Sequence, residues 1–257
     1  MKKLIALLLA MTMLVAFAGC NNTLPKETTE ATDPVETTEE TLPEGVMTHD
    51  EFVAAAMESQ VTVHTYVQAV ESWWDGCVQI YAQSKDGAYY IYDLACTEED
   101  AAKLVPGTKI EVTGYKGEWS GEVEIMDATY KILEGSYIVE EAADVTALMG
   151  TDELADHMNE LVAIKGLTVA ASKDADGNDV PFLYKWDGSG SQGDDIYFNV
   201  TIGDATYTFT VNAYMIGNED TYKAVEALKI GDKIDVEGFL YWYNDAQPHV
   251  TAVTPAA

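Results

Sequence analysis

The chain has 257 residues, of which 47% are hydrophobic and 10% aromatic, and its 44 acidic and 14 basic residues give a formal net charge of −30. The hydrophobic content excludes a wholly disordered chain, and the length allows one large domain or two small ones. The negative charge argues against nucleic acid or anionic lipid as the main partner, because binding to either depends on Lys and Arg.

The first twenty residues are typical of a secretory signal. Two lysines precede an apolar run over residues 4–18, which is shorter than the roughly twenty residues of a membrane-spanning helix. The run ends at Phe17-Ala18-Gly19-Cys20, which resembles the lipobox of bacterial lipoproteins, with Phe17 where Leu is usual. The resemblance implies removal of residues 1–19, attachment of palmitate-type acyl chains to Cys20, and an extracytoplasmic protein anchored to the bacterial cell membrane. An ordinary secretory signal with a chance Cys is the alternative.

Residues 20–46 are rich in Thr, Pro, Asp and Glu and contain few large apolar side chains. Such a segment cannot bury enough surface to offset the entropy of ordering, so we predict a disordered acidic linker. Charge repulsion and proline keep a linker of this kind extended. It suits a spacer between the membrane and a folded body.

The rest of the chain contains an internal repeat, because residues 104–115 align without a gap on residues 228–239. A repeat of this kind indicates the number of domains. We therefore predict two similar domains, at 47–140 and 148–257. The second carries an insertion at about 172–195 that is rich in Gly and Asp.

Alternating apolar residues predict five strands and a short helix in each domain. Each domain also begins with a capping signal for a helix, at Thr48 to Glu51 and at Thr151 to Glu153. In the first domain the expected strands are 61–69, 77–82, 88–92, 108–115 and 122–133, with the helix at 98–104. In the second they include 196–202, 205–211, 233–243 and 249–253, with the helix at 220–228.

Three strands, a helix and two strands is the order of a five-stranded OB barrel. The chain resembles the OB modules of secreted bacterial lipoproteins and those found beside secreted nuclease domains. The matching residues are Val61 to Val67, Ile80 to Gln83, Tyr90 to Tyr92, Leu104 to Gly114, and Glu122 to Ile125. The resemblance implies a mainly β fold with short helices, as two tandem five-stranded OB-like barrels after the linker. The nuclease-associated relatives keep their catalytic residues in a separate domain that this chain lacks.

All five Trp residues fall in the loops with which OB barrels bind oligosaccharides or oligonucleotides. Stacking rings beside carboxylates suit a sugar, whose C–H faces pack on rings while its hydroxyls donate to acids. The alternative is that the rings cap the barrel ends or form the contact between the domains. The candidate ligand-binding residues are Trp73, Trp74, Trp119, Trp186, Tyr241 and Trp242.

Cys77 and Cys96 flank one predicted hairpin and are expected on the same face of it. Outside the cytoplasm a disulfide between them would close a loop of about 20 residues and contribute about 3 kcal/mol. Two buried free thiols are the alternative, and the sequence leaves both open.

Asp174, Asp176 and Asn178 place oxygen ligands at alternate positions, as calcium loops do. The segment lacks the Gly and the Glu that complete an EF-hand loop. It therefore favours a solvated turn, with a calcium site as the alternative, and no other cofactor is expected.

No catalytic motif occurs, and the four His residues are scattered, so we predict that the protein is not an enzyme. Glu122 and Glu124 are interpreted as a solvated strand face. The predicted function is a cell-envelope lipoprotein that binds polysaccharide or cell-wall glycan; a protein-interaction or scaffold subunit of an envelope complex is the alternative. Single-stranded nucleic acid ranks below both and is not expected as a partner, because a basic groove would rest on Lys85, Lys103, Lys109 and Lys116.

Overall fold

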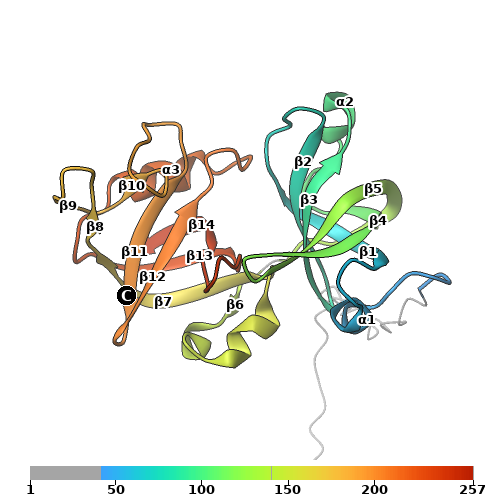
Figure 1. Cartoon of the computed structure of the whole chain (residues 1–257), viewed down its shortest axis with the longest axis horizontal. Coiled ribbons are helices and arrows are strands. Elements are labelled where there is room, and N and C mark those ends of the chain that lie inside the picture. Colours follow the sequence, from blue (N-terminus) through green and yellow to red (C-terminus); the bar gives the residue numbers. More distant parts are fainter. Residues whose placement is uncertain (1–41, 140, 257) are drawn as a thin grey trace, which may run out of the picture. The chain divides into compact units, whose positions relative to one another are not determined.

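The computed structural model describes residues 42–139 and 141–256 (Figure 1). The chain from Thr41 to Ala257 forms one compact unit. The predicted signal peptide, the lipidation site Cys20 and most of the predicted linker lie outside the described residues. Among the helices that the structure describes, none is long and apolar enough to cross a bilayer.

The first half of this unit is a closed five-stranded barrel with the strand order β1-β2-β3-β5-β4. The β3–β5 pair is parallel and the other pairs are antiparallel, which is the strand order predicted for an OB-like barrel. We call this half the first barrel. Its elements are α1 (His49–Ala54), β1 (Gln60–Val70), β2 (Cys77–Ser84), β3 (Gly87–Ala95), α2 (Glu98–Ala101), β4 (Thr108–Trp119) and β5 (Glu122–Ser136).

The local signals in the first barrel act as expected. The Thr48 hydroxyl accepts a hydrogen bond from the Glu51 amide at 3.2 Å, and the Glu51 carboxylate accepts one from the Thr48 amide at 2.9 Å, which completes the capping box. Every second residue of β1 from Val61 to Val67 is buried, so Val61, Val63 and Val67 face the barrel interior. The core of the first barrel is therefore built from the predicted period-two pattern.

The second half is a seven-stranded sheet in the order β10-β11-β12-β14-β13-β7-β6, in which β11 also pairs with β7. We call it the second sheet. Strands β7, β11, β12, β13 and β14 pair with one another as β1, β2, β3, β4 and β5 do, and the parallel pair β12–β14 corresponds to β3–β5. Its elements are β6 (Ala143–Asp144), η1 (Thr146–Leu148), η2 (Asp152–His157), β7 (Leu161–Ala170), β8 (Ser172–Lys173), β9 (Asp179–Val180), β10 (Leu183–Tyr184), β11 (Ile196–Ile202), β12 (Ala205–Val211), α3 (Glu219–Glu226), β13 (Lys233–Phe239) and β14 (His249–Pro255).

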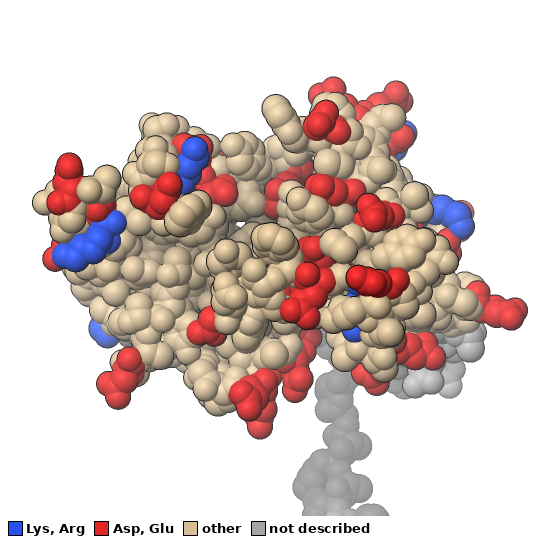
Figure 2. All heavy atoms as spheres, in the orientation of Figure 1, with Lys and Arg blue, Asp and Glu red and all other residues tan. Residues whose placement is uncertain are grey.

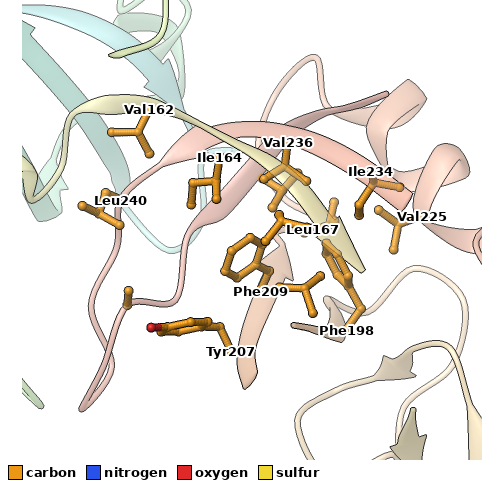
Figure 3. Close-up of a cluster of buried hydrophobic side chains, with 14 of the residues drawn as sticks. Val162, Ile164, Leu167, Phe198, Tyr207, Phe209, Val225, Ile234, Val236 and Leu240 are labelled. Atoms are coloured by element: carbon orange, nitrogen blue, oxygen red, sulfur yellow. The ribbon is translucent and has the colours of Figure 1, made fainter. Parts of the chain in front are cut away.

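The second sheet encloses its own hydrophobic core, shown in Figure 3. Phe198 of β11 and Phe209 of β12 meet edge to face at 6.0 Å between ring centroids, and Val225 reaches them from α3. Ile234 and Val236 of β13 are buried, as are Ile110 and Val112 at the matching positions of β4. The repeated segment thus has the same inward face in both halves, as predicted.

The glycine near the end of each repeated segment allows a close approach between strands. A Cβ at Gly114 would lie 2.7 Å from the Met126 carbonyl oxygen, and one at Gly238 would lie 2.5 Å from the His249 carbonyl oxygen. Both glycines are also buried. Only a residue without a side chain fits at these two corresponding places.

The helix predicted at 98–104 covers only Glu98–Ala101, and two further predicted elements differ from the structure for local reasons. Thr151 does not cap a helix, because its hydroxyl donates to the Leu148 carbonyl at 2.8 Å, and the 3-10 helix η2 follows it without a side-chain cap. The strand predicted over 233–243 ends at Phe239, because the chain then folds back on itself: the Gln247 amide donates to the Tyr241 carbonyl at 2.9 Å.

Candidate functional site

Stacked aromatic rings join the first barrel to the second sheet. Tyr81 of β2 lies parallel to Phe239 of β13, with 4.4 Å between ring centroids and 8° between planes. The Tyr81 hydroxyl lies 2.9 Å from Nδ1 of His249, and Tyr241 stacks on the His249 ring at 4.5 Å. Tyr81, Phe239 and His249 are all at least nine-tenths buried, so the two halves share a small core of their own.

Polar contacts surround this shared core. Oε1 of Glu71 accepts a hydrogen bond from Nδ2 of Asn212 at 2.7 Å, and Oε2 of Glu122 accepts one from the Trp242 amide at 2.8 Å. The Ser72 amide donates to the Tyr214 carbonyl at 2.8 Å. These three bonds, one between two side chains, one between a side chain and a backbone amide, and one between two backbone groups, join the first barrel to the second half of the chain.

A cleft of about 1150 Å³ opens beside these contacts. We call it the aromatic cleft, because both halves contribute Tyr and Trp rings to its walls. Five of the rings are substantially exposed, with Trp186 at 75% and Trp119 at 61%. The aromatic residues that line it are Tyr90, Tyr92, Trp119, Trp186, Tyr197, Tyr214, Tyr241 and Tyr243.

The charged groups of the aromatic cleft are mostly acidic. Glu71, Glu124 and Asp195 line it, and Lys173 is its one lysine among the described residues. Lys173 is paired with Asp179 at 2.7 Å. Figure 2 shows the same imbalance on the visible face of the molecule, where Asp and Glu side chains are widespread and Lys and Arg are few.

Burial raises the pKa of all three carboxyl groups. It raises the pKa of Glu124 to about 7, with a further contribution from Asp93. It also raises the pKa of Glu71 to about 7, reinforced by the charge of Asp195 and opposed by the hydrogen bond from Asn212. The pKa of Asp195 is raised by burial against a hydrogen bond from the Ala213 amide.

The interpretation of Glu122 and Glu124 as a solvated strand face is wrong. Their exposed fractions are 0% and 4%. The outward face of a barrel strand is solvated only until another element packs on it, and here Asn159 and Trp242 contact the start of β5. Burial consequently raises the pKa of Glu122 to about 8.

The structure divides the predicted aromatic residues among three environments. Trp119, Trp186 and Tyr241 line the aromatic cleft. Trp73 and Trp74 line a neighbouring cavity of about 350 Å³. Trp242 packs against the core of the second sheet, and an added Cβ at Gly121 would lie 2.7 Å from its ring. The environment of Trp242 matches the alternative in which a ring forms the contact between the two halves.

Sequence reasoning missed most of the tyrosines of the cleft. Tyr92, Tyr197, Tyr214 and Tyr243 come from strands and loops far apart in the chain. The available signal was the abundance of tyrosine, 15 residues in the whole chain. That signal does not tell which outward faces meet.

Cys77 and Cys96 are free thiols in the structure, one of the two states that the sequence left open. The predicted common face is wrong, because Asp93 adopts a left-handed conformation (φ 47°) and the β2–β3 register shifts between Val78 and Ile80. Cys77 therefore lies opposite Ala95 and lines the smaller cavity, whereas Cys96 packs against the core of the first barrel.

Asp174, Asp176 and Asn178 lie in the turn between β8 and β9, as the turn interpretation predicted. Oδ1 of Asp174 accepts hydrogen bonds from the amides of Asp176 at 3.0 Å and Asn178 at 2.8 Å. Within residues 42–139 and 141–256, no group of three or more His, Cys, Asp or Glu side chains could hold a metal ion. The calcium alternative stays a prediction.

The lysines considered for a basic groove lie away from the cleft. Nζ of Lys116 is buried and donates to the carbonyls of Phe52, Val53 and Ala55 at 3.1, 2.6 and 3.0 Å. Lys109 is also buried, with Nζ 5.6 Å from the Tyr66 ring centroid. Lys116 thus satisfies the end of α1 rather than a ligand.

No protein-family model and no curated protein matches the chain. Among solved structures it is similar to a murine DNA-binding protein bound with double-stranded DNA, at 12% identity and a TM-score of 0.34, over 76% of this chain and 96% of that one. The Ifi202 HINa domain in complex with 20-bp double-stranded DNA is 11% identical, with a TM-score of 0.32 over 79% and 99% of the two chains. The single-stranded DNA-binding protein from Thermus aquaticus is 12% identical, with a TM-score of 0.24 over 79% and 95%. These likenesses concern the fold alone, which is mainly β and OB-like.

These neighbours correct the functional predictions. All three are named for DNA, against the predicted polysaccharide or cell-wall glycan ligand and against the expectation that nucleic acid is no partner. The charge argument behind that expectation used the net charge of the whole chain. Ring stacking, which contributes much of single-strand binding, does not depend on net charge.

Proposed function

We propose that the protein is a non-catalytic binding protein whose aromatic cleft holds a ligand by stacking on the flat faces of that ligand. The observation that carries this proposal is the convergence of eight Tyr and Trp rings on one cleft. A volume of about 1150 Å³ is slightly larger than that of typical small-molecule sites, which range from roughly 300 to 1,000 Å³, so the cleft has room for such a ligand.

The exposed rings support a binding surface rather than a core. The exposed fractions are 61% for Trp119, 75% for Trp186 and 54% for Tyr214. Each of these side chains leaves a large apolar area in contact with water. A contiguous apolar surface of this kind, rimmed by polar groups, marks an interaction site. The deeper rings, Tyr90 and Tyr241, are in edge-to-face contact at 5.5 Å and form a fixed base.

We further propose that the second sheet is a second OB-like barrel, with domains at 47–140 and 148–257. The pairing of β11 with both β7 and β12 supports this, because it closes a ring of five strands in the OB order. The proposal includes a lipid anchor at Cys20 and a location outside the cytoplasm, on the strength of the lipobox-like segment. The ligand would then be met in the cell envelope.

The environment of His249, the histidine that lines the cleft, supports a binding protein rather than an enzyme. His249 contacts Tyr81 through Nδ1, and burial lowers its pKa to about 4. A neutral ring engaged in this way packs the interface and is poorly placed to activate a nucleophile.

Single-stranded nucleic acid is a second candidate, favoured by the exposed indoles of Trp119 and Trp186. Nucleobases stack on such rings, at about 1–3 kcal/mol per base. The phosphates would have to pass the carboxylates of the cleft with Lys173 as the lysine at hand. Counterion release would therefore contribute little to the affinity.

The test is a titration of the purified protein with flat heteroaromatic compounds, nucleosides and short oligodeoxythymidine, followed by intrinsic Trp fluorescence and calorimetry. We expect a ligand whose affinity falls on the order of tenfold or more in Trp119→Ala and Trp186→Ala, as expected for the loss of a stacking ring. Trp74→Ala is the matched control, because Trp74 is 79% exposed but lines the smaller cavity. Binding that all three variants leave unchanged would refute the proposal. Salt-dependent binding of the oligonucleotide alone would favour the second candidate.

A further inference from the structure

Glu124 is a buried carboxylate without a partner on the wall of the aromatic cleft. Its exposed fraction is 4%, and within the described residues no hydrogen bond or ion pair reaches its oxygens. Its oxygens are not among the fully enclosed polar atoms without a partner in the described residues, so they face the open space of the cleft. A ligand in the cleft is the group that can supply what the protein does not.

Two further carboxylates face the same space from other elements. Glu71 follows β1 and Asp195 precedes β11, and the charge of Asp195 acts on Glu71. Each accepts one hydrogen bond, from Asn212 and from the Ala213 amide, so lone pairs remain on both. The protein thus gathers three carboxyl groups from distant parts of the chain at one cleft.

The cleft offers little positive charge to balance these groups. Its lysine, Lys173, is already paired with Asp179 at 2.7 Å. In the described part of the chain, no group of three or more His, Cys, Asp or Glu side chains, these carboxyl groups included, could hold a metal ion. A compact metal ion therefore fits this arrangement less well than a larger cation.

We infer, on the basis of the proposed function, that the ligand of the aromatic cleft is an organic cation: a flat or alkyl body that carries a positively charged nitrogen. The faces of Tyr and Trp rings attract such a nitrogen through their quadrupoles. A positive charge beside Glu124, Glu71 and Asp195 favours their ionised forms, which then supply the opposite charge and accept its N–H groups where it has them. Both the aromatic rings and the carboxyl groups of the cleft therefore attract a positively charged ligand, and both disfavour a negatively charged phosphate.

Three probes that share a phenyl ring and differ in charge test this inference: benzyltrimethylammonium, benzyl alcohol and benzoate. Each is titrated into the purified protein by calorimetry, with Trp fluorescence as the second readout. We expect the cation to bind about tenfold or more tighter than the neutral alcohol, and benzoate to bind most weakly.

Variants connect that preference to the named carboxylates. Glu124→Gln keeps the shape of the side chain and should lower the affinity for the cation about tenfold, with the affinity for benzyl alcohol unchanged. Glu71→Gln is a second variant with the same expectation. Asp204→Asn, in the exposed turn between β11 and β12, is the matched control and should change neither affinity.

The two proposals fail in different ways. Equal affinity for the three probes, with loss of binding in Trp119→Ala, would overturn the cation inference and leave the stacking cleft intact. Preference for benzoate would overturn it as well. If none of the probes, including the heteroaromatic compounds above, binds in a way that depends on Trp119 or Trp186, both proposals are wrong.

Discussion

Replacing Glu122 with Gln tests whether this carboxyl group is neutral in the folded protein. Its side chain is fully buried, and Oε2 accepts a hydrogen bond from the Trp242 amide at 2.8 Å. Oε1 of Glu122 and Oδ1 of Asn159 have no partner among the described residues. Protonation turns one oxygen of the carboxyl group into a donor, and the amide group of Gln provides a donor permanently.

The size of the effect follows from the pKa of Glu122, which burial raises from an ordinary value of 4.5 to about 8 against the hydrogen bond from the Trp242 amide. The folded protein binds this proton more tightly than the unfolded chain does. Its contribution to the free energy of unfolding is therefore fully present below about pH 4.5 and is lost as the pH rises through 8. At about 1.4 kcal/mol per pKa unit, the full loss is on the order of 3–5 kcal/mol. A Gln side chain cannot ionise and escapes this loss.

Urea unfolding at pH 4.5 and pH 9 measures the difference. We expect Glu122→Gln to be about as stable as the parent at the lower pH and about 3 kcal/mol more stable at the higher one. Glu71 and Glu124 titrate in both proteins, so their effects largely cancel in the comparison. Glu118→Gln, on the exposed end of β4, is the control and should leave the stability unchanged. A variant that is less stable than the parent at pH 9, or a difference that does not depend on pH, would refute the reasoning.

Three further substitutions test the packing. Lys116→Met removes three hydrogen bonds from a buried ammonium to the end of α1 and should lower the free energy of unfolding by about 2–4 kcal/mol in urea titrations, whereas Lys103→Met, at an exposed ion pair, should have no measurable effect. Gly238→Ala places a Cβ 2.5 Å from a backbone oxygen of β14 and should lower stability by at least about 2 kcal/mol; an unchanged melting temperature would contradict this. Phe239→Ala removes the ring stacked on Tyr81 and should cost about 3–5 kcal/mol, measured by thermal unfolding, and a cost below 1 kcal/mol would show that the shared core contributes little.

The elements of the fold could be predicted because their signals are local. The capping box at Thr48 acts within four residues, and the alternation of Ile110 with Val112 and of Ile234 with Val236 sets the inward face of a strand by geometry alone. The gapless repeat extended this reasoning from one half of the chain to the other. Element order, core positions and the OB-like strand order therefore followed from the amino-acid sequence.

The aromatic cleft could be predicted only in part, because it depends on which outward faces meet. The pattern around Glu122 and Glu124 is the same for a solvated strand and for one that a second sheet covers, and packing buried both side chains. Trp119 and Trp242 stand in equivalent loops of the predicted barrels, yet Trp119 lines the cleft and Trp242 packs against the core of the second sheet. The alternation of apolar residues determines which face of each strand points into the core. Whether the outward side chains are exposed or buried depends on contacts with distant parts of the chain, such as the one between Glu122 and Trp242, and the strand pattern carries no signal for such contacts.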